Sequence, residues 1–180
     1  MAGLDPAIHV FDPAWKTWTR GSSPREGRMG WRRCKNGCTS IGRDMENRNP
    51  RTIEEARALV AQVEALFMPW DIPALLAGFT DDCVVRFGDL PEFQGKVALE
   101  DLFRRRSERQ IGYRLKKELR AFAGDTLANY WQGEWRDRDS GKRMQGRGVE
   151  IWIMRDGLIA VWEAAFNANE IGAASAMGVT

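Results

Sequence analysis

The feature that most constrains the fold is a change of hydrophobic period at about residue 113. Before it, apolar residues recur at helical spacing, and after it they alternate with polar residues at period two, which is typical of half-buried strands. Short turn sequences divide the second part into strands expected at about 113–123, 126–136, 143–155 and 158–168. This order predicts an α+β fold in which three helices pack on a curved antiparallel sheet, with a pocket between them.

Helices and one more strand are expected ahead of the meander. The first helix begins at the capping box Thr52–Glu55, where a hydroxyl and a carboxylate each accept a hydrogen bond from a backbone N–H, and it ends before Pro69. A second helix is expected over 72–79 and a third over 96–110, with a strand at 83–87 between them.

The charge of the chain divides it at about residue 50. The net charge is +2, yet residues 1–50 hold nine of the 27 Lys and Arg and only five of the 25 acids. This segment also holds six of the 18 glycines and four of the seven prolines, so a disordered leader is expected at 1–50. Its opening resembles the start of mis-assigned reading frames, which favours a true start at Met45. The domain is then expected at 51–170 and a flexible tail at 171–180.

Composition excludes several classes of function. His9 is the only histidine, so the folded body has no histidine general base and no imidazole metal ligand. No apolar run approaches the ~20 residues that span a bilayer, and the sparse cysteines favour a reducing cytoplasm. The domain without its basic leader carries a slight negative charge, which argues against nucleic acid. No glycine-rich phosphate loop is present, and no metal or organic cofactor is expected.

Three segments carry a resemblance to a known superfamily: FTDDCVVRFGDLPEFQGKVALEDLF, IGYRLKKELRAFAGDTLANYWQGEW and GVEIWIMRDGLIAVWEAAFN. Over about 52–169 the chain resembles nuclear transport factor 2-like (SnoaL-like) proteins, and within them a bacterial subfamily known as domain of unknown function 1348. The resemblance implies a cone whose concave face lines a pocket for a small molecule and whose outer sheet face pairs two subunits. The superfamily includes isomerases, cyclases, epoxide hydrolases and non-catalytic binding modules, so it implies no particular reaction.

The hairpin turns predict which side chains share the pocket. With Asp156-Gly157 as a two-residue turn, Glu150 lies directly opposite Glu163. The turns Ser140-Gly141 and Gly124-Asp125 extend this pair to a row across four strands, Glu118–Trp131–Glu150–Glu163, with Trp135, Trp152 and Asn167 on the same face. The other face is almost wholly apolar, carrying Val149, Ile151, Ile153, Trp162 and Phe166, and is the expected homodimer interface.

Facing glutamates have Cβ atoms only about 5 Å apart, so their carboxylates, when buried together, must share a proton or enclose a cation, and Arg86 is the best internal cation. We therefore expect Glu150 or Glu163 to be a general base, the other to be an acid, and Arg86 to organise the charge. Glu118, Trp131, Trp135, Trp152 and Asn167 are the expected ligand-binding residues, for a small and largely apolar ligand. The alternative is an inert ion cluster in a non-catalytic ligand-binding or dimerisation module.

The run Arg104–Arg106 follows the apolar face of the third expected helix. It is interpreted as a solvated helix end, and an anion site is the alternative.

Overall fold

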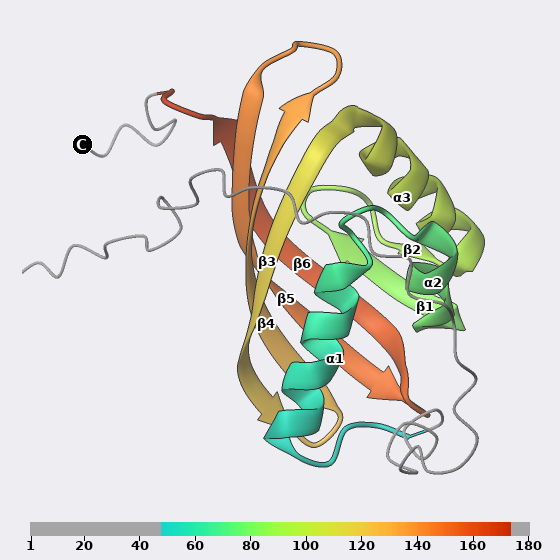
Figure 1. The fold of residues 1–180 in the computed structure, drawn as a ribbon. Coiled ribbons are helices and arrows are strands. Elements are labelled where there is room, and N and C mark those ends of the chain that lie inside the picture. The colour runs from blue at the N-terminus through green and yellow to red at the C-terminus, as the bar shows by residue number, and fades with distance from the viewer. Residues whose placement is uncertain (1–47, 174–180) are drawn as a thin grey trace, which may run out of the picture. The chain divides into compact units, whose positions relative to one another are not determined.

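A computed structural model describes residues 48–173 of the chain (Figure 1). The predictions for the leader up to residue 47 and for the last seven residues of the tail lie outside the described residues. The elements are α1 (Ile53–Ala65), α2 (Ile72–Ala77), β1 (Phe79–Phe87), β2 (Phe93–Gln94), α3 (Lys96–Arg109), β3 (Gln110–Ala123), β4 (Thr126–Asp137), β5 (Arg143–Arg155) and β6 (Leu158–Glu170). Every predicted helix and strand is present, and β2 is added.

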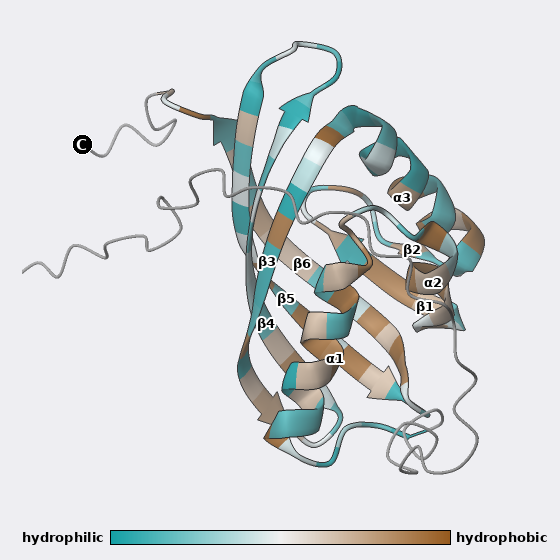
Figure 2. Ribbon diagram, viewed as in Figure 1, coloured by the Kyte–Doolittle hydropathy of each residue, from teal (hydrophilic) through white to brown (hydrophobic). Residues whose placement is uncertain are grey.

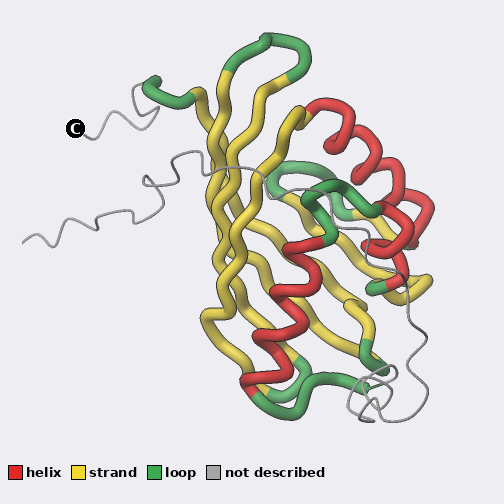
Figure 3. The backbone as a smooth tube through the Cα atoms, in the orientation of Figure 1, coloured by secondary structure: helices red, strands yellow, loops and turns green. Residues whose placement is uncertain are grey.

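The strands form one six-stranded sheet in the order β2-β1-β6-β5-β4-β3. All neighbours pair antiparallel except β1 and β6, which run parallel. The sheet curves, and the helices lie on its concave side (Figures 1 and 3). The predicted α+β class, with helices on one face of a curved sheet, is therefore confirmed.

Local sequence explains where the helices begin. The Thr52 hydroxyl accepts a hydrogen bond from the backbone N–H of Glu55 at 3.2 Å, which confirms the N-terminal cap of α1. Asp71 caps α2 in the same way through the N–H of Ala74 at 3.0 Å. Apolar residues of the helices pack with buried strand residues in one core. The hydrophobic stretches of β1 and β6 lie beside the helices (Figure 2).

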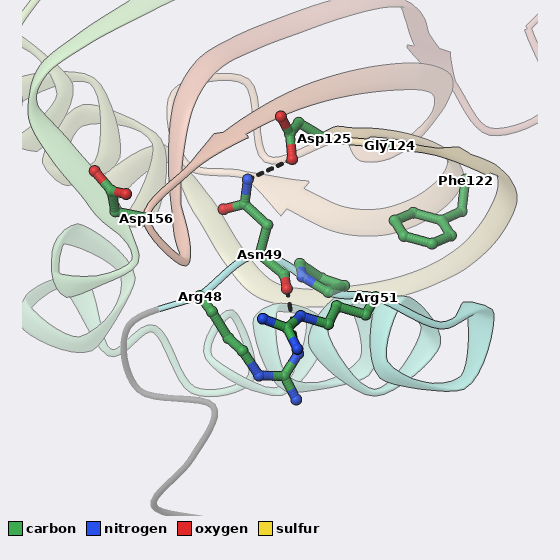
Figure 4. Close-up of a pocket in the computed structure, with 8 residues that line it drawn as sticks. Arg48, Asn49, Arg51, Phe122, Gly124, Asp125 and Asp156 are labelled. Carbon is green, nitrogen blue, oxygen red and sulfur yellow. Dashed lines mark hydrogen bonds between the residues drawn. The ribbon is translucent and has the colours of Figure 1, made fainter.

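The ordered contacts begin before the predicted start of the domain. Asn49 Nδ2 donates to Asp125 Oδ1 at 2.6 Å (Figure 4). The same nitrogen donates to the carbonyl of Met154 at 3.2 Å, and Asn49 Oδ1 accepts from the N–H of Gly157 at 2.8 Å. One side chain thus ties the N-terminal segment to the β3–β4 and β5–β6 turns. This segment could not be assigned from sequence because it has no helical or strand period.

The hairpin of β5 and β6 departs from the predicted register within four residues of its turn. Met154 lies opposite Ile159 as predicted, but the next pair is Ile153 with Val161, so Ala160 is an extra residue on β6. This β-bulge shifts every later pair by one position and turns each β6 side chain to the opposite face. Glu163 therefore lies opposite Ile151, and the predicted pairing of Glu150 with Glu163 is wrong.

A second bulge lies in the hairpin of β3 and β4. Pairs near the turn follow the prediction, with Phe122 opposite Leu127, but Arg120 is an extra residue and Leu119 pairs with Asn129. Beyond it Lys117, not Glu118, lies opposite Trp131. A bulge places one residue of one strand out of the ladder, and turn arithmetic cannot detect it because the turn itself is unchanged.

The hairpin of β4 and β5 is regular but ends in a longer loop than predicted. Arg136 pairs with Arg143, and Asp137 and Lys142 close the loop with a backbone hydrogen bond of 2.9 Å. Asn129 therefore lies opposite Glu150, and Trp131 lies opposite Gly148. This shift of two positions keeps every side chain on its predicted face, so Trp131 and Glu150 still share the concave face.

Candidate functional site

The middle of the concave face carries a row of inward-facing residues that runs across four strands. Leu119, Asn129, Glu150 and Ala164 are successive cross-strand partners on β3, β4, β5 and β6. Asn129 and Glu150 are both buried, in surroundings that are otherwise mostly apolar. A buried acid beside a buried amide is unusual, because burying polar groups costs free energy unless they are hydrogen-bonded.

Glu150 forms a dry ion pair with Lys117, which reaches it diagonally from β3. Lys117 Nζ lies 2.6 Å from Glu150 Oε2, and the two side chains are only 3% and 6% exposed. The indole Nε1 of Trp152 donates to the same Oε2 at 3.0 Å. Both donors thus meet one carboxylate oxygen, and Oε1 receives no hydrogen bond from any residue in 48–173.

The environment opposes the charge of Lys117. Burial lowers the pKa of its ammonium group, while the charge and hydrogen bond of Glu150 raise it. The ammonium also lies over two aromatic rings, 5.8 Å from the centroid of Phe67 and 5.4 Å from that of Trp152. The glutamate and the ring faces are therefore what keep a charged lysine in this position.

Several buried donors and acceptors around the pair have no hydrogen-bond partner among the described residues. They include both polar atoms of the Asn129 amide and the indole Nε1 atoms of Trp131 and Trp162. Leaving such a group unpaired costs about 1–3 kcal/mol each. Structures retain unpaired groups mainly where a function requires them, so this part of the concave face is the strongest candidate site.

Aromatic side chains fill most of the concave face around the ion pair. The cavity next to it measures only about 10 Å³ and is lined by Lys117, Glu150, Trp152 and Trp162 with Val63, Phe67, Leu75, Phe79, Phe103 and Ile159. That volume accommodates about one water molecule. A ligand larger than water can therefore reach the ion pair only after one of these side chains moves.

The predicted site residues divide between the two faces of the sheet. Glu150, Trp131 and Trp152 lie on the concave face as expected, and Trp135 joins them by packing its ring against Tyr113 at 6.0 Å. The acid Glu163 and the cation Arg86 do pair, but on the outer face, where Arg86 is 50% exposed and also binds Glu92 at 2.7 Å. They cannot organise Glu150 from there.

The two remaining predicted ligand-binding residues are also on the outer face. Glu118 is exposed and pairs with Arg120 at 3.1 Å. Asn167 is exposed opposite Arg147. The bulges at Arg120 and Ala160 are the reason in both cases, since each one reverses the facing of the strand residues beyond it.

The turn arithmetic missed Lys117, although the sequence contains a signal for it. On β3, the residues at positions 113, 115, 117 and 119 are Tyr, Leu, Lys and Leu, while the intervening positions are all charged. Alternation of this kind places Lys117 on the apolar face with its neighbours. A lysine on a buried face needs a carboxylate partner, and Glu150 is the buried acid that supplies it.

A larger and more open cavity lies elsewhere, beside the turns that Asn49 ties together (Figure 4). Its volume is about 480 Å³, and it is lined by Arg48, Asn49, Pro50, Arg51, Phe122, Gly124, Asp125 and Asp156. Arg48 is engaged by Glu55 at 2.7 Å, and that arginine is the main cause that lowers the pKa of Glu55 to about 2. Most polar groups that line this larger cavity anchor the N-terminal segment, so the concave face is the better candidate for a functional site.

Metal and membrane sites find little support in the described part of the chain. Within residues 48–173, no group of three His, Cys, Asp or Glu side chains comes together as a possible metal site. The one cysteine in that range, Cys83, is buried, and burial raises the pKa of its thiol. No helix among the described residues is long and apolar enough to cross a membrane.

Comparison with solved structures identifies the fold. The epoxide hydrolase/cyclase-like enzyme SalBIII of pyran ring formation in salinomycin aligns with 66% of this chain and 98% of its own, at 15% identity and a TM-score of 0.57. An LEH-like epoxide hydrolase from M. tuberculosis aligns with 66% of this chain and 86% of its own, at 19% identity and a TM-score of 0.52. A candidate polyketide cyclase from Pseudomonas putida KT2440 aligns with 62% of this chain and 91% of its own, at 19% identity and a TM-score of 0.52.

At these identities the likeness establishes the architecture and not an activity. The comparison with curated proteins returns no match. A family model described as "Protein of unknown function (DUF1348)" matches residues 49–177, which is well over half of the chain. The chain therefore belongs to this family and has the SnoaL-like, nuclear transport factor 2-like cone fold.

Proposed function

We propose that this protein is a SnoaL-like enzyme that performs general acid/base chemistry on a small, largely apolar molecule, with Glu150 as the base. The observation that supports it most strongly is the buried ion pair of Lys117 and Glu150, surrounded by unpaired hydrogen-bonding groups. A buried ion pair adds little net stability, because the desolvation of both charges offsets their attraction. Chemistry is a better reason for its presence than folding.

The geometry suits the removal of a proton next to a carbonyl group. Glu150 Oε2 is engaged by Lys117 and Trp152, which leaves Oε1 to accept the proton. The carbon–hydrogen bond breaks, the proton moves to Oε1, and the electron pair moves onto the carbonyl oxygen. The Asn129 amide and the unpaired indole N–H groups are donors available for that oxygen. Return of the proton to a neighbouring carbon completes an isomerisation.

The same groups suit a second reaction of the same class. Glu150 can take a proton from a water molecule in the adjacent cavity while the water oxygen bonds to a carbon of an epoxide. The ring carbon–oxygen bond breaks, its electron pair stays on the ring oxygen, and that alkoxide takes up a proton from Lys117 or from solvent. Water addition of this kind is a hydrolase reaction, and it uses the base in the same position.

One observation favours a non-catalytic alternative. The cavity of about 10 Å³ beside the ion pair is far smaller than the several hundred Å³ of ordinary ligand pockets. If the aromatic side chains do not move, the protein is a binding or dimerisation module with an inert ion pair. Proton exchange with solvent distinguishes the two possibilities, because only a working base catalyses it.

The test is deuterium exchange at the α-carbon of small apolar ketones in heavy water, followed by mass spectrometry. Water addition is followed in parallel with small apolar epoxides in ¹⁸O-labelled water. We expect activity in the wild type and a loss of about 10²-fold or more in Glu150→Gln. Glu134→Gln, a control on the outer face, should keep the wild-type activity. No activity in the wild type with either set, or full activity in Glu150→Gln, would refute the proposal.

We also propose that two copies pair through the outer face of β5 and its neighbours. Val149, Ile151 and Ile153 project there and are 50%, 39% and 39% exposed. The composition of this face differs from the sequence prediction, since Trp162 and Phe166 lie on the concave side. Ile151→Glu should convert a dimer into a monomer in sedimentation, and a monomeric wild type at tens of micromolar would contradict the proposal.

A further inference from the structure

The arginine run at the end of α3 divides into two kinds of residue. Arg104 and Arg105 are exposed and pair along the helix with Glu100 and Asp101, at 2.5 and 3.0 Å. They confirm the predicted solvated helix end. Arg106 points the other way and is partly buried.

Arg106 lies within an aromatic cage. Its guanidinium carbon is 4.9 Å from the ring centroid of Phe87, 5.4 Å from that of Trp70 and 5.9 Å from that of Tyr113. These rings come from the end of β1, the α1–α2 connection and the start of β3. Ring faces attract a cation but accept no hydrogen bond from it, so the Tyr113 hydroxyl is the acceptor that these three side chains offer to the guanidinium.

No carboxylate among the described residues lies within ion-pair distance of Arg106, and the polar group that it meets in that set is the uncharged hydroxyl of Tyr113. Its neighbour Lys117 is compensated by Glu150, and Glu64, which approaches the backbone of Lys117, is paired with Lys116 at 3.2 Å. Arg106 therefore leaves the concave face with one uncompensated positive charge. Guanidinium binds carboxylates in a bidentate manner, so this charge selects for an anion of that shape.

The rings of the cage contact rings that line the cavity beside the ion pair. The Phe67 ring, which lines that cavity, lies 4.8 Å from Trp70 and 6.3 Å from Tyr113, while Trp162 lies 5.0 Å from Phe87. Tyr113 and Lys117 are four residues apart on β3, which is about 13 Å along an extended strand. A ligand held at Arg106 therefore needs an extended apolar body to approach Lys117.

We infer that Arg106 recognises the carboxylate of a small monoanionic ligand, whose apolar body extends along the aromatic wall towards Lys117 and Glu150. The inference rests on the proposed function only for the placement of the reacting carbon. A ligand of this class would displace the guanidinium from ring faces and from the Tyr113 hydroxyl, which is a small cost compared with moving packed core rings. Arg106 would then both recognise the carboxylate and, by moving, open the way for the ligand.

Binding of phenylacetate and hydrocinnamate, compared with the uncharged primary amide of each, tests this inference by quenching of tryptophan fluorescence. In the wild type the acids should bind at least about tenfold more tightly than their amides. Arg106→Gln should abolish that preference and Arg106→Lys should keep part of it. Arg105→Gln, which changes a neighbouring exposed arginine, should leave it intact.

Equal affinity for acid and amide in the wild type would overturn the inference, as would a preference that survives Arg106→Gln, or the absence of binding of either acid at millimolar concentration. Glu150→Gln separates this result from the proposed function, because it should lose proton exchange while retaining the preference for acids. Exchange activity without any preference for acids would refute the role of Arg106 alone.

Discussion

Replacing Lys117 with Met tests whether the interior ion pair is as dry as its geometry indicates. At 2.6 Å and an effective dielectric constant of about 20, the attraction between the two charges is about 6 kcal/mol. Removing the cation leaves the Glu150 carboxylate buried with Trp152 as its remaining donor, which costs about 3–5 kcal/mol of unfolding free energy. Glu150→Gln alone should cost somewhat less, since the lowered pKa of Lys117 makes loss of its proton easier.

The double variant Lys117→Met/Glu150→Gln should recover most of that loss and lie within about 1–2 kcal/mol of the wild type. The double-mutant cycle, measured by urea denaturation at neutral pH, should therefore give a coupling energy of about 5 kcal/mol. Arg86→Met and Glu163→Gln form the matched control on the outer face, where solvent screens the pair. Its coupling should be indistinguishable from zero.

A coupling energy between Lys117 and Glu150 no larger than that between Arg86 and Glu163 would refute the reasoning, because the interior pair would then be as solvated as a surface pair. A double variant as unstable as Lys117→Met would refute it in another way. It would mean that the site needs these side chains for packing and not for mutual charge compensation.

Two further predictions concern other parts of the fold. Asn49→Ala should lower the free energy of unfolding by about 1–3 kcal/mol because three hydrogen bonds are lost. A chain starting at Met45 should instead melt like the full chain. Equal melting temperatures for Asn49→Ala, the shortened chain and the full chain would contradict the anchoring role of Asn49. Arg109 and Ser140 lower the pKa of Asp137 from 3.8 to about 2, so its contribution is present above pH 3.8 and lost as pH falls through 2. Melting scans across that range should show a steeper decline in the wild type than in Asp137→Asn, and parallel curves would contradict it.

The placement of the elements could be predicted because local patterns specify them. The cap at Thr52, the helical spacing that follows it and the alternation after residue 113 each depend on residues near in sequence. The strand β2 was missed because two residues are too short to show any period. The contacts of Asn49 were missed because they join positions more than seventy residues apart.

The candidate site shows where such prediction ends. The burial of Glu150, Trp131 and Trp152 followed from parity along their own strands, and a register shift of two on β4 and β5 left it intact. The placements of Glu163 and Glu118 failed at single extra residues, Ala160 and Arg120. Neither residue has a sequence signature typical of a bulge. A register counted from the turn therefore assigns every strand residue beyond the bulge to the wrong face of the sheet.

The sequence by itself determined the order of helices and strands, the apolar and polar faces of β5, and the lack of any histidine in residues 48–173, because each is a property of neighbouring residues or of composition. The tertiary structure alone decided that Glu150 meets Lys117 and not Glu163, and that Arg106 turns into an aromatic cage while Arg104 and Arg105 face solvent. The physical reason is that strand pairing and helix docking bring these groups together across the sheet. Bulges form where a curved sheet must bend, and that requirement comes from packing the whole cone.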